Sequence, residues 1–137
     1  MALSISRVEY FYCNVRDRPG EAHRLLSMLA ASSVNLLAFN AIPMGLDQTQ
    51  LVLFPDDAGT LARLAEAEGL LLDGPQFALL IRGDDELGAL AEIHRKLFDE
   101  GVNISAACGI TDGTGRFGYL VYVAAEDFTG AATALGI

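Results

Sequence analysis

Apolar positions along the chain alternate between the spacing of strands and the spacing of helices. Residues 8–15 and 77–81 are rich in aromatic and β-branched side chains, which predicts a strand at each. Apolar residues at helical spacing follow each predicted strand. The first set is Ala22, Leu25, Leu26 and Leu29, and the second is Leu90, Ile93 and Leu97.

A predicted strand pair and a further helix come after each of these segments. The first half has strands at 34–42 and 48–54, a helix at 57–68 and a short fourth strand at 70–72; the second half has strands at 102–110 and 116–123 and a helix at 126–135. The order βαββαβ is the ferredoxin-like plan, an α+β fold with an antiparallel sheet and the helices on one face.

A constant offset relates the two halves. Gly88 lies 68 positions after Gly20, and the Val-Asn pair at 34–35 recurs at the same offset at 102–103. Further identical pairs at this offset are Asp17 with Asp85, Leu29 with Leu97, Ala38 with Ala106, Ile42 with Ile110 and Gly45 with Gly113. We therefore expect two copies of one unit, at residues 1–74 and 75–137.

The offset carries the predicted strand at 70–72 beyond Ile137, so the second copy is expected to lack a fourth strand of its own. An unpaired edge in a hydrophobic sheet is a liability. Leu3 to Ser6 have no counterpart in the repeat. We predict that this segment, or a strand from the linker or another chain, covers the edge.

Composition narrows the classes of function. The chain of 137 residues is 52% hydrophobic and 20% charged, as expected of a globular protein, and its net charge of -9 disfavours nucleic acid as a partner. No apolar stretch approaches membrane-spanning length and the N-terminus lacks a secretion signal, so we expect a cytoplasmic protein without a membrane partner. Cys13 and Cys108 have no His or Cys neighbours at ligand spacing, which predicts reduced, buried thiols and no metal or other cofactor.

Polar groups suited to a small zwitterion surround the first turn of each copy. The helix after Asp17-Arg18-Pro19-Gly20 begins with unpaired N–H groups and a positive dipole end, which suit a carboxylate. Asp17 or Asp85 suits an ammonium group. In residues 102–110 the even positions form an apolar face, so Asn103, and Asn35 by analogy, should point away from the helices and offer their amides. Carboxylate and ammonium on one carbon describe an α-amino acid.

The "VRDRPG" turn, the fourteen positions from Gly20 to Val34 and the βαββαβ order resemble ACT domains, here two in tandem over nearly the whole chain. ACT domains are regulatory modules that bind small ligands, usually amino acids, and are commonly attached to enzymes of amino-acid metabolism. The resemblance implies a free-standing sensor without catalytic activity, acting on an enzyme on another chain.

Carried over from the family, the ligand positions fall on Asp17, Gly20 and Asn35 in copy one, with Arg18 and Pro19 in the same turn, and on Asp85, Gly88 and Asn103 in copy two. The family's arrangement implies that the Asp17 turn faces Asn103 and the Asp85 turn faces Asn35. Leu87 stands where copy one has Pro19, which is expected to weaken the second site.

Other interpretations of these residues stay open. The aspartates could favour their helices electrostatically, and the asparagines could bond to nearby backbone. An acylphosphatase-like hydrolase shares the fold plan and would use Arg16 or Arg18 with Asn40, although the glycine-rich signature around the arginine is missing. A third possibility is a protein–protein interaction module with vestigial pockets. His23 and His94 do not correspond between the copies and are expected to face solvent.

Apolarity on both faces of the strands predicts a homodimer. Leu37 and Phe39 are expected on the side of Asn35, and residues 119–123 are apolar throughout, while helices cover one face only. An antiparallel sheet with a free face should alternate, and an uncovered apolar patch marks a contact surface. We therefore expect two chains to associate through apposed sheets.

Overall fold

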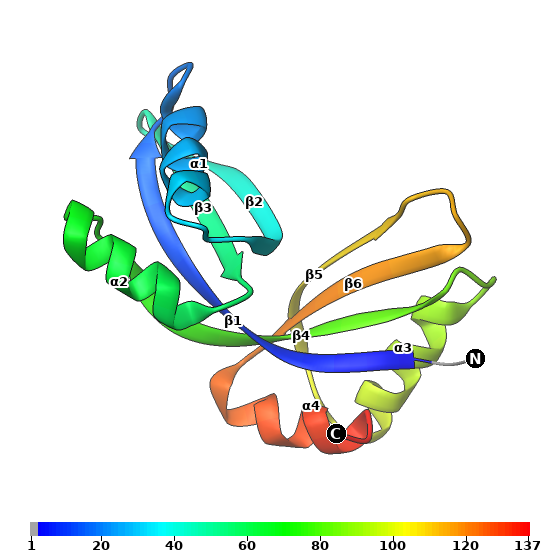
Figure 1. The fold of residues 1–137 in the computed structure, drawn as a ribbon. Helices are drawn as coiled ribbons and strands as arrows, with labels where there is room; N and C mark the ends of the chain where they lie inside the picture. The colour runs from blue at the N-terminus through cyan, green and yellow to red at the C-terminus, as the bar shows by residue number, and fades with distance from the viewer. Residues whose placement is uncertain (1–2) are drawn as a thin grey trace. The chain divides into compact units, whose positions relative to one another are not determined.

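The computed structural model describes residues 3–137, in which strands and helices alternate as Figure 1 shows. The first half contains β1 (Leu3–Arg16), α1 (Glu21–Ala31), β2 (Leu36–Gly45), β3 (Gln48–Pro55) and α2 (Ala58–Glu68). The second half contains β4 (Asp73–Asp84), α3 (Ala89–Asp99), β5 (Ile104–Thr111), β6 (Arg116–Val123), a 3₁₀ helix (Ala125–Asp127) and α4 (Phe128–Ala134). The strand order is β2-β3-β1-β4-β6-β5, and β1 and β2 each pair antiparallel with β3, as β4 and β5 do with β6.

The chain divides into two compact units that share its two longest strands. The first unit is Glu9–Gln76, and the second is Phe77–Ile137 with the described part of Met1–Val8. The beginning of β1 thus belongs to the second unit, where Leu3 and Ile5 pack against the core. This confirms that residues at the start of the chain supply the strand that the second copy lacks.

The beginning of β4 plays the corresponding part in the first unit. Tyr10 donates a hydrogen bond from its hydroxyl group to Oε1 of Gln76 at 3.1 Å, so this part of β4 is tied to β1 by a side chain. The predicted fourth strand at 70–72 is wrong. Leu70 donates its N–H to the carbonyl of Ala65 at 2.9 Å and closes the end of α2, and Leu70 and Leu72 are apolar because they pack against the core of the first unit.

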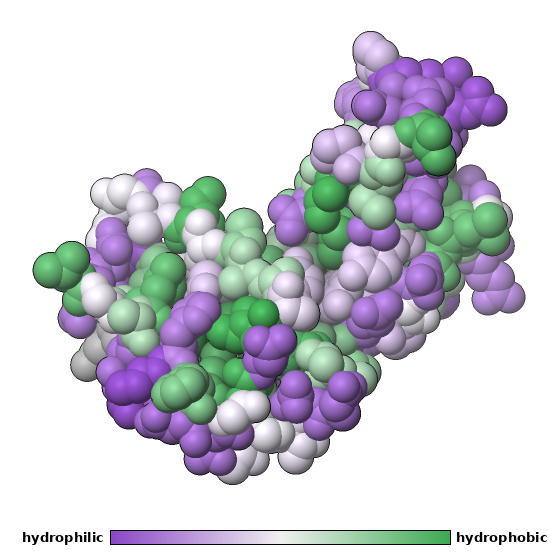
Figure 2. Space-filling model, turned by 180° about the vertical axis from the view of Figure 1, so that it is seen from behind, coloured by the Kyte–Doolittle hydropathy of each residue, from purple (hydrophilic) through white to green (hydrophobic). Residues whose placement is uncertain are grey.

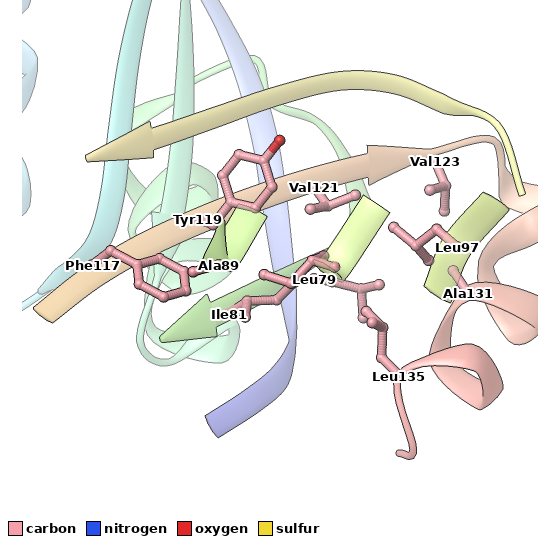
Figure 3. Packing of buried hydrophobic residues seen from close by; sticks show 11 residues of the cluster. Leu79, Ile81, Ala89, Leu97, Phe117, Tyr119, Val121, Val123, Ala131 and Leu135 are labelled. Atoms are coloured by element: carbon pink, nitrogen blue, oxygen red, sulfur yellow. The ribbon is translucent and has the colours of Figure 1, made fainter. Parts of the chain in front are cut away.

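Each unit has a core on the face of its strands that the helices cover. In the first unit this core comprises Phe11, Cys13, Leu25, Leu29, Val34, Leu51, Leu53, Leu61 and Leu64. Figure 3 shows the second core, where side chains of β4, β6, α3 and α4 point toward one another; among them are Leu79, Ile81, Ala89, Leu97, Val121 and Ala131. The α+β fold with helices on one face of each set of strands follows from these two cores.

A β-bulge in β5 changes which side chains face the helices. The pairing with β6 shifts register between Ile104 and Ala106. After the shift, Ala107 lies opposite Val121 and Gly109 opposite Tyr119, and both partners belong to the core. Residues opposite each other share a face, so the odd positions face the helices from there on. The expected single apolar face of even positions is therefore wrong beyond Ile104.

The same bulge occurs at the equivalent place in β2, between Leu36 and Ala38. Phe39 consequently packs against the core of the first unit and does not share a side with Leu37. On the face away from the helices, Val52, Phe54 and Leu120 are buried. The open apolar face from which we expected a homodimer is thus smaller than the sequence suggested, and the dimer stays a prediction.

Two further features bear on the expected class of protein. Cys13 is buried, which raises the pKa of its thiol, whereas Cys108 is exposed because the bulge turns it to the face away from the helices, so the prediction of two buried thiols is wrong for Cys108. Within residues 3–137, no helix combines the length and apolarity that a membrane crossing requires.

Candidate functional site

The turn between first strand and first helix has the same backbone in both units. Asp17 donates its N–H to the carbonyl of Asp47 at 2.9 Å, and Asp85 donates its N–H to the carbonyl of Gly115 at 2.9 Å. Asp47 and Gly115 are themselves separated by the repeat offset and lie in the turn of the following strand pair. Each aspartate is therefore held beside a hairpin turn by its own main chain, with its side chain exposed.

Gly20 and Gly88 immediately precede the helices α1 and α3. Their φ angles are 92° and 84°, in the left-handed region that favours glycine. A Cβ added at either would meet no atom within 4 Å, so the backbone angle and not crowding explains why both are glycine. The N–H groups of the first helical turn follow directly, without a side-chain cap at either glycine.

Asn35 and Asn103 both lie one residue before a strand, and both are exposed. The carbonyl of Asn35 accepts a hydrogen bond from the N–H of Asp56 at 2.9 Å. Val34 and Val102, the residues before them, donate to Leu29 and Leu97 at 2.9 Å and close the preceding helices in the same way. The two asparagine side chains are thus available at the surface next to a fixed backbone.

In the second unit the turn borders a pocket of about 620 Å³. The turn and the first residues of α3 form one wall, and the end of β5 with the start of β6 forms the other. The lining residues are Asp85, Glu86, Leu87, Gly88, Ala89, Leu90, Ala91, Gly109, Ile110, Thr111, Phe117 and Gly118. The structure thus brings Asp85 and Gly88 together. Asn103, at the opposite end of β5, does not line this pocket.

Charges differ between the two turns. In the first unit, Arg18 Nε lies 2.8 Å from Glu21 Oε1 and Arg24 lies 3.2 Å from the other oxygen; these hydrogen bonds lower the pKa of the Glu21 carboxyl. In the second unit Glu86 stands in place of Arg18 and Ala89 in place of Glu21. The residues that line the pocket include two carboxylates and no basic side chain.

A polar contact between α3 and β6 escaped the sequence-based prediction. His94 Nε2 lies 2.7 Å from the hydroxyl group of Tyr119, so this histidine is exposed but has a partner. Figure 3 shows the hydroxyl oxygen directed away from the aliphatic side chains of the core. Burial raises the pKa of Tyr119. The equivalent residues of the first unit are Leu26 and Leu51, a difference that a comparison of the two copies could have revealed.

Comparison by sequence finds no matching protein-family model and no matching curated protein. Comparison by structure finds a protein from Bacteroides thetaiotaomicron with a TM-score of 0.81 and 16% identity, covering 96% of this chain and 88% of that one. The regulatory subunit of aspartate kinase from Thermus thermophilus gives a TM-score of 0.66 at 18% identity, covering 97% and 93%.

The alpha and beta subunits of an aspartokinase give a TM-score of 0.59 at 17% identity, covering 100% of this chain and 99% of theirs. At these identities the similarity concerns the fold. It confirms the prediction of a small α+β protein similar to ACT regulatory domains.

Proposed function

We propose that this protein is a regulatory protein that senses an amino acid and has no catalytic activity of its own. It would consist of two ACT-like domains in tandem, residues 1–74 and 75–137 in the sequence, with the beginning of β1 belonging to the second unit and the beginning of β4 to the first. Its output would be an enzyme on another chain, and the working form would be a homodimer. Support comes from the fold, which is shared with a regulatory subunit of aspartate kinase, and from the duplicated turn.

The pocket beside the Asp85 turn is the observation that carries this proposal. It places a carboxylate next to the first turn of an 11-residue helix, within a volume of about 620 Å³ that suits a small molecule. The N–H groups of that turn would hold the ligand's carboxylate, and Asp85 its ammonium group. Gly88, with a φ of 84°, lets the chain enter the helix directly beside the pocket.

The first unit supplies the same backbone with different side chains. Asp17 would again meet the ammonium group, Gly20 leads into the helix, and Pro19 fixes the turn. Arg18 is held near the turn by Glu21. Because the turn with Pro19 is the more rigid, we expect it to bind more tightly than the turn with Leu87.

Two other functions compete. A protein–protein interaction module with vestigial pockets would have the same fold and would not respond to amino acids. A hydrolase resembling acylphosphatase would need a free arginine beside an asparagine. Arg18 is engaged with Glu21, and neither Arg16 nor Arg18 has the glycine-rich signature of that family around it, which makes the hydrolase the weaker alternative.

A thermal-shift screen of the purified chain against the amino acids, followed by calorimetric titration, tests the proposal. Removing one hydrogen bond to a charged group should weaken binding about ten- to a hundredfold, so we expect that loss in Asp85→Asn and Asp17→Asn for their respective sites. Asn35→Ala and Asn103→Ala test the asparagines in the same way. Asp73→Asn, which removes an exposed carboxylate elsewhere, is the matched control. Stabilisation by no amino acid would favour the interaction module, and turnover of an acyl phosphate the hydrolase.

A further inference from the structure

Side chains that line the pocket of the second unit differ in size and polarity from the equivalent side chains of the first copy. Pro19, Ala22 and Thr49 of the first copy are replaced by Leu87, Leu90 and Phe117, and each replacement is larger and apolar. All three replacements line the pocket. Three main-chain hydrogen bonds of the turn recur in both copies, so the backbone is closely similar while the lining has changed.

Several of these apolar side chains reach the surface. Leu87 is fully exposed, Ile110 is 75% exposed and Leu90 39%, while Phe117 is buried to 7%. Figure 2 shows how apolar side chains reach the surface among hydrophilic ones on one face of the molecule. Leu87 and Leu90 lose contact with water when an apolar group enters the pocket beside them.

Gly109 lets the strand lie close to the ring of Tyr119 and to Leu90. It lies on the face of β5 that the helices cover, where a Cβ would be 2.9 Å from Cδ1 of Tyr119 and 3.7 Å from Cδ1 of Leu90. The first copy has Ala41 at this position. A glycine here keeps the wall next to Leu90 free of a side chain of its own.

The charges of the lining restrict the ligand further. Asp85 and Glu86 are both acidic, and none of the residues that line the pocket is basic. Arg82 and Arg116 belong to the adjoining hollow, where Arg116 is paired with Asp84. An acidic side chain on the ligand would meet repulsion and no compensating partner in the lining itself. One carboxylate suffices for an α-ammonium group, and apart from Glu86 and Thr111 the remaining lining side chains are apolar or absent.

We infer that the pocket of the second unit selects an α-amino acid with a large, uncharged, apolar side chain, which contacts Leu87, Leu90 and Phe117. This inference rests on the proposed function and adds the class of ligand to it. The first unit, with smaller residues at the same positions, does not share this preference.

Calorimetric titration of the full chain with leucine, alanine and aspartate tests the inference. Each methylene group buried contributes about fourfold in affinity, and leucine has three more carbon atoms than alanine, so partial burial predicts that leucine binds about tenfold more tightly. Aspartate should bind more weakly than alanine. In Leu87→Ala/Leu90→Ala, leucine affinity should fall toward that of alanine, while alanine affinity stays within about twofold.

The control is Leu71→Ala, which removes an exposed leucine that does not line the pocket and should leave both affinities unchanged. Alanine binding as tightly as leucine in the parent, or aspartate binding more tightly, would overturn the inferred ligand class and leave amino-acid sensing intact. A preference for leucine that survives the double substitution would place the apolar site elsewhere and also overturn it. Binding of no amino acid at all would remove the proposed function and this inference together.

Discussion

Gly109 is the position where the structure makes the sharpest prediction about stability. It pairs with Tyr119 across the strands, and a Cβ added there would lie 2.9 Å from Cδ1 and 3.4 Å from Cε1 of the tyrosine ring. Carbon atoms in contact prefer about 3.5 to 4.0 Å. The ring is only 6% exposed and its hydroxyl group is held by His94 at 2.7 Å, so it has little freedom to retreat.

Gly109→Ala should therefore lower the free energy of unfolding. Overpacking of this kind costs about 1 to 3 kcal/mol. Replacing glycine by alanine also restricts the unfolded chain, which offsets about 0.4 to 1 kcal/mol. We expect a net loss of about 1 to 2 kcal/mol and disruption of the His94–Tyr119 contact.

The first unit provides the control and the rescue, because Ala41 pairs there with Leu51 in the same register. Urea denaturation followed by circular dichroism should show that Gly109→Ala/Tyr119→Leu, which recreates this pair, is at least about 1 kcal/mol more stable than the sum of the single changes predicts. Ala41→Gly should relieve nothing and cost about 0.5 to 1 kcal/mol. A parent-like urea midpoint for Gly109→Ala, or single changes that simply add, would show that the close approach of ring and strand does not limit this position.

Four further outcomes follow from the fold. Removing residues 1–6 takes two side chains from the second core and its outer strand, so the melting temperature should fall by several degrees or the chain should associate; an unchanged melting curve and size would contradict this. Gly20→Val should cost about 1 to 2 kcal/mol in ligand-free protein because φ is 92°, and parent-like melting would rule this out. Asp57 caps α2 by accepting a hydrogen bond from the N–H of Gly59 at 3.0 Å, and hydrogen bonds from Thr60 and Gly59 lower the pKa of its carboxyl group. The stability that this carboxylate contributes is therefore present at neutral pH and is lost as the pH falls below the ordinary range of a carboxyl group. The difference in melting temperature between the parent and Asp57→Ala should shrink on acidification. Light scattering at micromolar concentration should show a dimer, and a monomer would count against it.

Local patterns were enough to predict the order of elements. Helix α2 illustrates this, since Asp57 caps it, helical spacing continues through Leu61 and Leu64, and Gly69 ends it in a left-handed conformation. Strand partners depend on residues far along the chain, which is why residues 70–72 were mistaken for a strand. Their apolar side chains contact the core of the first unit, as those of a strand would, but their backbone forms no strand.

Only those site residues that are identical in the two copies could be predicted from the sequence. The turn residues Asp85 and Gly88 were found because they repeat Asp17 and Gly20. The bulge before Ala106 hid the rest, because an extra residue reverses the alternation from which facing side chains are inferred. Gly109 was thus assigned to the wrong face.

Residues that are identical in the two copies and residues that differ between them have different physical explanations. The identical glycines have a backbone explanation, since both precede a helix at positive φ, and this would hold in a protein that binds nothing. The substitutions around the second pocket have no such explanation. Leu87 and Leu90 add apolar surface at the same kind of turn where Pro19 and Ala22 suffice for folding, and exposed apolar surface is unfavourable unless something covers it. A ligand with an apolar side chain would cover it, so the residues that differ argue for binding more strongly than the residues that repeat.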